Sequence, residues 1–92
     1  WLVQAFIERS GRHKRPWMIV VTSDHGEMLG DHGYFRKCEP YEGSAHIPLL
    51  IRGSQDLGFV SALTHAGPVC LEDILPTLLD VAGLPPPAGI EV

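Results

Sequence analysis

The spacing of hydrophobic side chains predicts one helix at the start of the chain and a second near its end. Four apolar residues among the first ten recur at helical intervals: Leu2, Val3, Phe6 and Ile7. This pattern ends near Ser10-Gly11. Apolar residues follow the same period over 71–82: Leu71, Ile74, Leu75, Leu78, Leu79 and Ala82. The second helix is expected to stop at Gly83 and to hold Pro76 within its first turn.

A nearly all-apolar run over 17–22, rich in β-branched residues, predicts a buried strand after the first helix. Short strands are also predicted over 48–52, beginning at Pro48, and over 60–63. A helix followed by an apolar strand is half of a parallel α/β unit. The expected fold class is therefore α/β, with a parallel-type central strand and flanking helices. Residues 23–47 follow neither period, which indicates a functional or mobile segment.

Size and composition limit the classes of protein to consider. The 92 residues, 45% hydrophobic and 20% charged, predict at most one small folded domain. The net charge of −4 and the lack of an extended basic stripe argue against nucleic acid as a partner. No apolar run is long enough to predict a membrane span. Cys38 and Cys70 form no closely spaced metal-type pair and are expected to be free thiols, and the sequence leaves localisation open.

The loop after the first strand carries two Asp-His pairs, at 24–25 and 31–32, among several glycines. Ligands of parallel α/β sheets bind beyond the carboxyl ends of the strands, which is where Asp24 and His25 lie. Carboxylate oxygen and imidazole nitrogen both bind divalent cations, and glycine allows close approach of the backbone. The pattern therefore predicts that Asp24 and His25 bind a metal ion. The alternative is that Asp24 caps a helix and the histidines are ordinary loop residues.

The same loop supplies further candidates for a site that handles an anion. Lys37 could neutralise charge on a sulfate or phosphate oxygen or on the leaving oxygen. Arg36 and Lys37 could equally be a solvated pair on the loop. His46, just before the strand at Pro48, could point toward the ion or serve as a structural histidine.

Four segments together resemble the C-terminal part of the catalytic domain of the sulfatases. They are Thr22 to Gly33 (TSDHGEMLGDHG), Phe35-Arg36-Lys37, Tyr41 to Leu49 (YEGSAHIPL) and Asp73 to Leu84 (DILPTLLDVAGL). Sulfatases belong to the alkaline phosphatase-like α/β superfamily and hydrolyse sulfate esters with a bound divalent cation, usually calcium. The resemblance therefore implies a sulfuric ester hydrolase acting on a small-molecule or carbohydrate sulfate ester.

The resemblance also implies roles for single residues. Asp24 and His25 match two metal ligands of the family, and Lys37 matches the lysine that contacts the substrate sulfate. Lys37 and His46 are thus the candidate catalytic residues, and Lys37, His46 and His32 the candidate substrate-binding residues. Calcium is the expected metal, while the imidazole ligand keeps manganese and zinc under consideration.

The family's nucleophile, a formylglycine made within a Cys-x-Pro-x-Arg type motif, is not matched in this sequence. Cys38-Glu39-Pro40-Tyr41-Glu42 has the cysteine and proline, but Glu42 stands where arginine is required. Residues 1–92 are therefore expected to be part of a sulfatase catalytic domain, inactive alone, with the formylglycine in the rest of that domain. Two alternatives stay open: a phosphonate or phosphate ester hydrolase of the same superfamily, and a noncatalytic ion-binding remnant.

Overall fold

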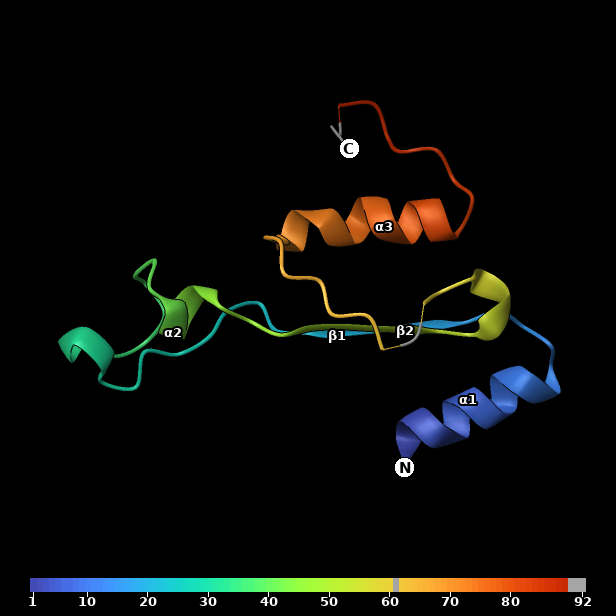
Figure 1. Cartoon of the computed structure of the whole chain (residues 1–92), viewed down its shortest axis with the longest axis horizontal. Coiled ribbons are helices and arrows are strands. Elements are labelled where there is room, and N and C mark those ends of the chain that lie inside the picture. The colour runs from blue at the N-terminus through green and yellow to red at the C-terminus, as the bar shows by residue number, and fades with distance from the viewer. Residues whose placement is uncertain (61, 90–92) are drawn as a thin grey trace. The chain divides into compact units, whose positions relative to one another are not determined.

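The computed structural model describes residues 1–60 and 62–89, which contain α-helices, 3-10 helices (η) and a small sheet (Figure 1). The elements in chain order are α1 (Leu2–Arg12), β1 (Met18–Thr22), η1 (Asp31–Gly33), α2 (Glu42–Ala45), β2 (Leu49–Gly53), η2 (Gln55–Leu57), η3 (Leu71–Asp73) and α3 (Ile74–Val81). The chain divides into two compact units, Trp1–Phe59 and Val60–Val92. The candidate site residues all lie in the first unit.

β1 and β2 form a two-stranded antiparallel ladder (Figure 1), so the expectation of a parallel-type pairing is wrong for these strands. Met18 faces Gly53 at one end of the ladder and Thr22 faces Leu49 at the other. A parallel pair needs a crossover connection that returns the chain to the same end of the sheet. Residues 23–48 instead continue outward from the end of β1 and turn back, so the second strand returns antiparallel.

Helix α1 ends close to its expected boundary and packs beside the start of β1. Its last turn carries Arg9 and Arg12, whose cationic side chains complement the negative end of the helix dipole. The ring of Phe6 meets that of Trp17 edge to face, with centroids 6.2 Å apart. Such aromatic pairs add to the area they bury, so this contact anchors the helix in the first unit.

The second unit contains the predicted C-terminal helix, although its first residues, Leu71–Asp73, form a 3-10 turn rather than α-helix. The Asp73 carboxylate accepts a hydrogen bond of 2.7 Å from the Cys70 amide, and Pro76 falls in the first turn of α3 as expected. Residues 60, 62 and 63 of the third predicted strand are not in a strand, and residue 61 lies outside the described residues. Too few apolar residues alternate there to hold a strand without a partner.

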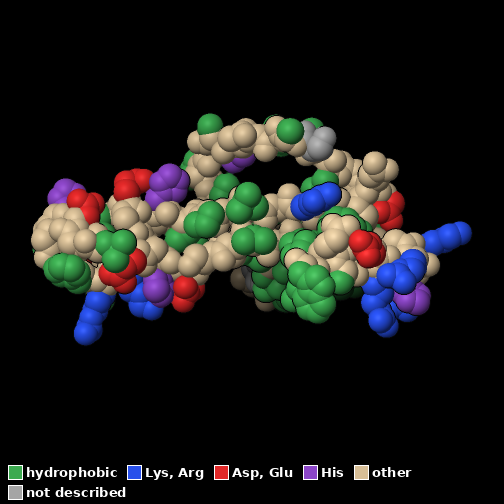
Figure 2. Space-filling model, turned by 90° about the horizontal axis from the view of Figure 1, so that it is seen from below, with side chains coloured by type: hydrophobic (Ala, Val, Ile, Leu, Met, Phe, Trp, Pro, Cys, Tyr) green, Lys and Arg blue, Asp and Glu red, His purple; other side chains and the backbone are tan. Residues whose placement is uncertain are grey.

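Little of the described chain is buried, and what is buried lies in the loop rather than under the sheet. Met28 and Ser44 are 3% and 6% exposed, whereas Val21 and Leu50 on the strands are 52% and 60% exposed. Figure 2 shows hydrophobic side chains on the surface of the molecule. The expectation that the strand at 17–22 is buried is thus wrong within this chain, because a two-stranded sheet leaves much of its surface uncovered. Among the described helices, none is both long and apolar enough to cross a membrane.

Candidate functional site

The candidate site begins directly after β1, where the chain turns at Ser23. The Ser23 hydroxyl donates a hydrogen bond of 2.7 Å to the carbonyl oxygen of His25 and fixes this turn. The turn brings the Asp24 carboxylate oxygen Oδ2 to 3.4 Å from His25 Nε2. The Asp24 side chain is 81% exposed and that of His25 is 35% exposed. Both groups are therefore accessible to a ligand from solvent.

The imidazole of His25 is oriented by a neighbouring backbone group. Its Nδ1 atom lies 2.8 Å from the carbonyl oxygen of Gly26. A carbonyl oxygen only accepts, so in the neutral imidazole this contact assigns the proton to Nδ1 and leaves a lone pair on Nε2. Histidines that bind metals use this arrangement, in which a backbone carbonyl fixes the tautomer and the ring nitrogen opposite is the ligand.

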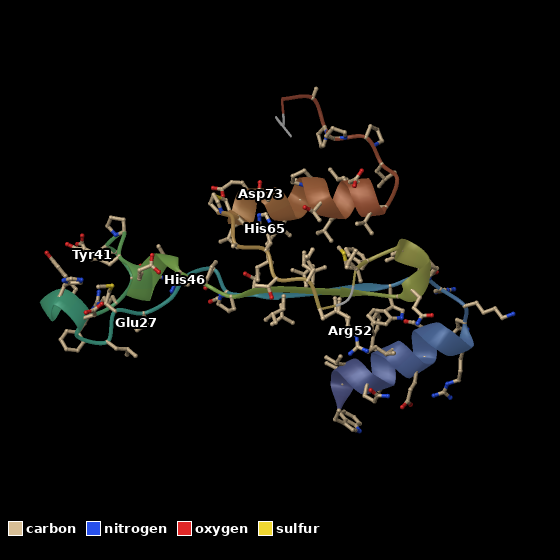
Figure 3. The ribbon with its side chains drawn as sticks, viewed as in Figure 1. Glu27, Tyr41, His46, Arg52, His65 and Asp73 are labelled. Carbon is tan, nitrogen blue, oxygen red and sulfur yellow. The ribbon has the colours of Figure 1, made fainter. Side chains whose placement is uncertain are left out.

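Lys37 is brought to this imidazole from twelve residues further along the chain. Its Nζ atom donates a hydrogen bond to His25 Nε2. The loop turns back on itself because the Met28 amide donates to the Arg36 carbonyl at 2.9 Å. The Arg36 amide in turn donates to a carboxylate oxygen of Glu27, whose side chain is drawn in Figure 3. Asp24, His25 and Lys37 thus form one cluster, which we call the loop cluster.

The short helix α2 connects the segment around Gly26 with the segment around Lys37. The Ser44 hydroxyl donates to the Lys37 carbonyl at 2.7 Å, and the Gly26 amide donates to the Ser44 carbonyl at 2.7 Å. A Cβ atom on Gly26 would overlap the carbonyl oxygen of Gly43. Gly26 thus permits two segments of the loop backbone to approach each other closely.

Ser44 and Gly43 were not among the residues that the sequence pattern singled out. Their adjacent small side chains, inside the otherwise polar stretch Tyr41 to His46, are the signal that could have indicated a tight backbone crossing. Without the structure, nothing in the spacing shows that this pair lies opposite Gly26. Both residues contribute to the site by fixing the backbone rather than by presenting a charged group.

His46 and His32 have partners outside the loop cluster. His46 Nδ1 lies 2.8 Å from a carboxylate oxygen of Glu42, and both side chains are strongly exposed. The ring of His32 stacks on Tyr41, with centroids 4.4 Å apart and an interplanar angle of 23°. Figure 3 shows His46 and Tyr41 at separate points of this loop. The structure therefore brings together three of the five predicted site residues and places the other two along the same loop.

The donor set of the loop cluster fits part of the ligand shell of a divalent cation. Two neighbouring ligands of a calcium ion, at about 2.4 Å and roughly at right angles, lie about 3.4 Å apart. The separation of Asp24 Oδ2 from His25 Nε2 has this value. Among the described residues, no group of three or more His, Cys, Asp or Glu side chains is positioned to hold a metal. Within the described residues, Asp24 and His25 are thus a candidate pair of ligands, and a complete shell would need further ligands.

Comparison with known proteins identifies the family. A family profile described as Sulfatase matches residues 1–84, and the chain therefore belongs to the sulfatase family. It is 44% identical over 73 residues to Arylsulfatase K of Bos taurus and 42% identical over 73 residues to that of Homo sapiens, matches that cover 79% of this chain. It is also 41% identical over 81 residues to an Arylsulfatase of Clostridium perfringens. No solved structure matches it.

The matches cover only part of each relative. The aligned region spans 13% of the two Arylsulfatase K proteins and 16% of the bacterial arylsulfatase, although it covers about four fifths of this chain. Family membership implies an alkaline phosphatase-like α/β fold, which confirms the predicted fold class at this level. At the level of the family, sulfatases hydrolyse sulfate esters and generally depend on divalent metals.

Proposed function

We propose that this chain forms part of the active site of a sulfatase that hydrolyses a small-molecule or carbohydrate sulfate ester. The observation that carries the proposal is the convergence of three groups at the end of β1. The Asp24 carboxylate, the Nε2 lone pair of His25 and the Lys37 ammonium meet there, on the part of the chain that matches the sulfatase profile.

Asp24 and His25 are the proposed ligands of a divalent cation, with calcium as the first candidate and manganese or zinc as alternatives. When bound, the metal would supply positive charge that stabilises the charge developing on the sulfate group. The Nδ1 contact with Gly26 supports this role, because in the neutral imidazole it leaves the lone pair on Nε2, which lies 3.4 Å from the Asp24 carboxylate. His25 would need no change of tautomer to bind the metal.

Lys37 is the proposed sulfate ligand and acts by electrostatics. Its ammonium group donates to the single lone pair of His25 Nε2, which can serve either Lys37 or a metal ion. With Nε2 engaged as a metal ligand, the ammonium group is available to a sulfate oxygen beside it. A preoriented cation at that place stabilises the negative charge that builds on sulfate or leaving oxygen as the ester bond breaks.

The rest of a sulfatase domain is the proposed source of the formylglycine nucleophile and the remaining metal ligands. Cys38 is an exposed thiol, but the residue that would have to be arginine in its motif is Glu42, which pairs with His46. An acidic side chain at that place cannot supply the positive charge of the arginine. We therefore do not assign Cys38 as the nucleophile, and residues 1–92 are proposed to be a part of the catalytic domain.

His46 and His32 are proposed to lie on the substrate side of the loop. Since both are exposed and pair with neighbouring loop side chains, replacing either with alanine should leave folding intact while raising KM for the ester. His13, an exposed histidine at the end of α1, offers a matched control, and His13→Ala should leave KM unchanged. An unchanged KM in both loop variants would remove them from the substrate side.

The reaction is tested with the full-length protein that contains these residues. Hydrolysis of 4-nitrophenyl sulfate is compared with that of 4-nitrophenyl phosphate and of a phosphonate monoester, before and after chelation of divalent metal. We expect kcat/KM to be highest for the sulfate ester, to fall on chelation and to recover with added calcium. A preference for the phosphate or phosphonate ester would overturn the assignment in favour of that hydrolase class. Calcium binding without hydrolysis of any ester would favour a noncatalytic module.

A further inference from the structure

Ser44 is the one polar side chain classed as buried in the described part of the chain, at 6% exposed. It carries no charge and lies seven residues from Lys37, so the sequence pattern gives it no role. Its hydroxyl donates to the Lys37 carbonyl at 2.7 Å, and its own carbonyl accepts from the Gly26 amide at 2.7 Å. Ser44 is thus hydrogen-bonded both to the backbone of Lys37 and to the backbone next to His25.

We infer that Ser44 is a positioning residue of the sulfatase site. Its hydroxyl fixes the backbone of Lys37, and so helps to place the Lys37 ammonium group beside the proposed metal ligand His25. The inference rests on the proposed function, because it assigns Lys37 to sulfate. It adds a residue that would contact neither sulfate nor metal but would determine the position of the Lys37 ammonium group.

The physical argument starts from the length of the lysine side chain. Four rotatable bonds give its ammonium group a wide range of positions, and movement of the backbone would widen that range further. The Lys37 backbone lies on a loop without strand or helix, so a hydrogen-bond donor from another part of the chain is needed to fix its carbonyl oxygen. The buried Ser44 hydroxyl supplies that contact. Displacement of a catalytic group by about 1 Å can lower rates about a hundredfold.

The hydrogen bond between Ser44 and Lys37 is made by a hydroxyl group that is largely buried. The buried Met28 lies beside Gly43, with its sulfur 3.4 Å from the place of a Cβ atom on that glycine. Water has little access to a side chain enclosed in this way. Removing the hydroxyl would deprive the Lys37 carbonyl of this hydrogen bond.

The test is Ser44→Ala in the full-length protein, with Ser54→Ala as the matched control. Ser54 also uses its hydroxyl in a hydrogen bond to backbone, accepting from the Trp17 amide at 3.0 Å, but it lies at the other end of the sheet. Ser44→Ala is expected to lower kcat/KM for a sulfate ester by about tenfold to a hundredfold and to weaken inhibition by inorganic sulfate. Calcium affinity, measured by titration calorimetry, should stay unchanged, because Asp24 and His25 keep their contacts. Ser54→Ala should change none of the three.

A double-mutant cycle separates a positioning role from a merely structural one. If Ser44 acts through Lys37, adding Ser44→Ala to Lys37→Ala should cost little further activity, so the two effects are strongly non-additive. Ser44→Thr, which retains a hydroxyl, should restore most of the lost activity. If Ser44→Ala does not fold, Ser44→Cys takes its place in the cycle, since a thiol is a weaker donor of similar size.

The outcomes also separate this inference from the proposed function. Unchanged kcat/KM and sulfate inhibition in the folded Ser44 variant, or full additivity with Lys37→Ala, would overturn the positioning role while leaving the sulfatase assignment intact. Normal activity of Lys37→Ala would instead defeat the role of Lys37 itself.

Discussion

Gly26 and Gly43 approach each other so closely that a Cβ atom on Gly26 would overlap the carbonyl oxygen of Gly43. The amide of Gly26 donates to the carbonyl of Ser44 in the same crossing. The loop is therefore not an open excursion beyond the sheet, since its two halves are in backbone contact. His25 precedes this crossing directly, so its position depends on the two glycines.

Gly26→Ala is expected to force the two halves of the loop apart. Overpacking of this kind costs about 1–3 kcal/mol in the free energy of unfolding, and kcat/KM should fall with it as His25 moves. Gly11→Ala is the control, because nothing lies within 4 Å of its Cβ position and alanine favours helix α1. That variant should raise stability slightly, by about 0.5–1 kcal/mol. The melting temperatures of the two variants are measured by thermal unfolding. Equal melting temperatures would contradict the close contact between Gly26 and Gly43.

Asp24→Asn should weaken calcium binding by about tenfold or more, because it removes the charge of a proposed ligand while keeping the shape of the side chain. The carboxylate is 81% exposed, so the melting temperature should hardly change. Asp56→Asn, on the exposed turn η2, is the matched control and should bind calcium normally. Titration calorimetry measures both. Wild-type affinity in the Asp24 variant would remove this residue from the metal site.

Lys37→Ala should lower kcat/KM for a sulfate ester about 10²- to 10³-fold, the usual cost of deleting one group that stabilises a developing oxyanion. Lys14 is the chain's other lysine and is exposed in the turn after α1. Lys14→Ala should leave activity near that of the wild type. The kcat/KM of both variants is measured by steady-state kinetics and expressed per folded molecule. Loss of folding with undiminished kcat/KM in the remaining folded protein would show Lys37 to be structural.

The exposed apolar pair Val21 and Leu50 should make the 92-residue chain bind hydrophobic dye. The two residues are cross-strand partners, and each leaves more than half of its surface exposed. Contiguous apolar surface of this kind binds such dyes and promotes association. The double change Val21→Thr and Leu50→Thr should lower dye fluorescence and light scattering, while Leu29→Thr, at a separate loop position, should alter them little. Equal signals from all three proteins would contradict the prediction.

Several elements of this protein could be read from the sequence because local forces determine them. Helix α1 follows from apolar residues spaced three and four apart, and the β-branched run Met18–Thr22 adopts the strand that its propensity favours. Pro76 falls in the first turn of α3, where its missing amide costs least. The sulfatase resemblance likewise rests on contiguous motifs, and the family profile confirms it.

For the candidate site, the sequence determined some of the contacts between residues and only the structure determined the others. Asp24 and His25 are adjacent in the chain, so the sequence alone places the proposed metal ligands together. Lys37 reaches His25 only because the loop folds back, and Ser44 joins them through contacts that no spacing reveals. His46, which the sequence places near the ion as one possibility, pairs instead with Glu42. The metal and substrate roles of these residues stay predictions.

Sequence by itself therefore determined helices α1 and α3, strands β1 and β2, the family and the chemical character of the loop, since each depends on residues close together in the chain. Tertiary structure alone decided the antiparallel pairing of β1 with β2, the exposure of their apolar side chains, and the meeting of Lys37 with His25. The exposure follows because a two-stranded sheet leaves much of its surface uncovered. The antiparallel pairing and the contact of Lys37 with His25 depend on the path of residues 23–48. That path is set by long-range backbone contacts such as Gly26 with Ser44, which leave no periodic signal in the sequence.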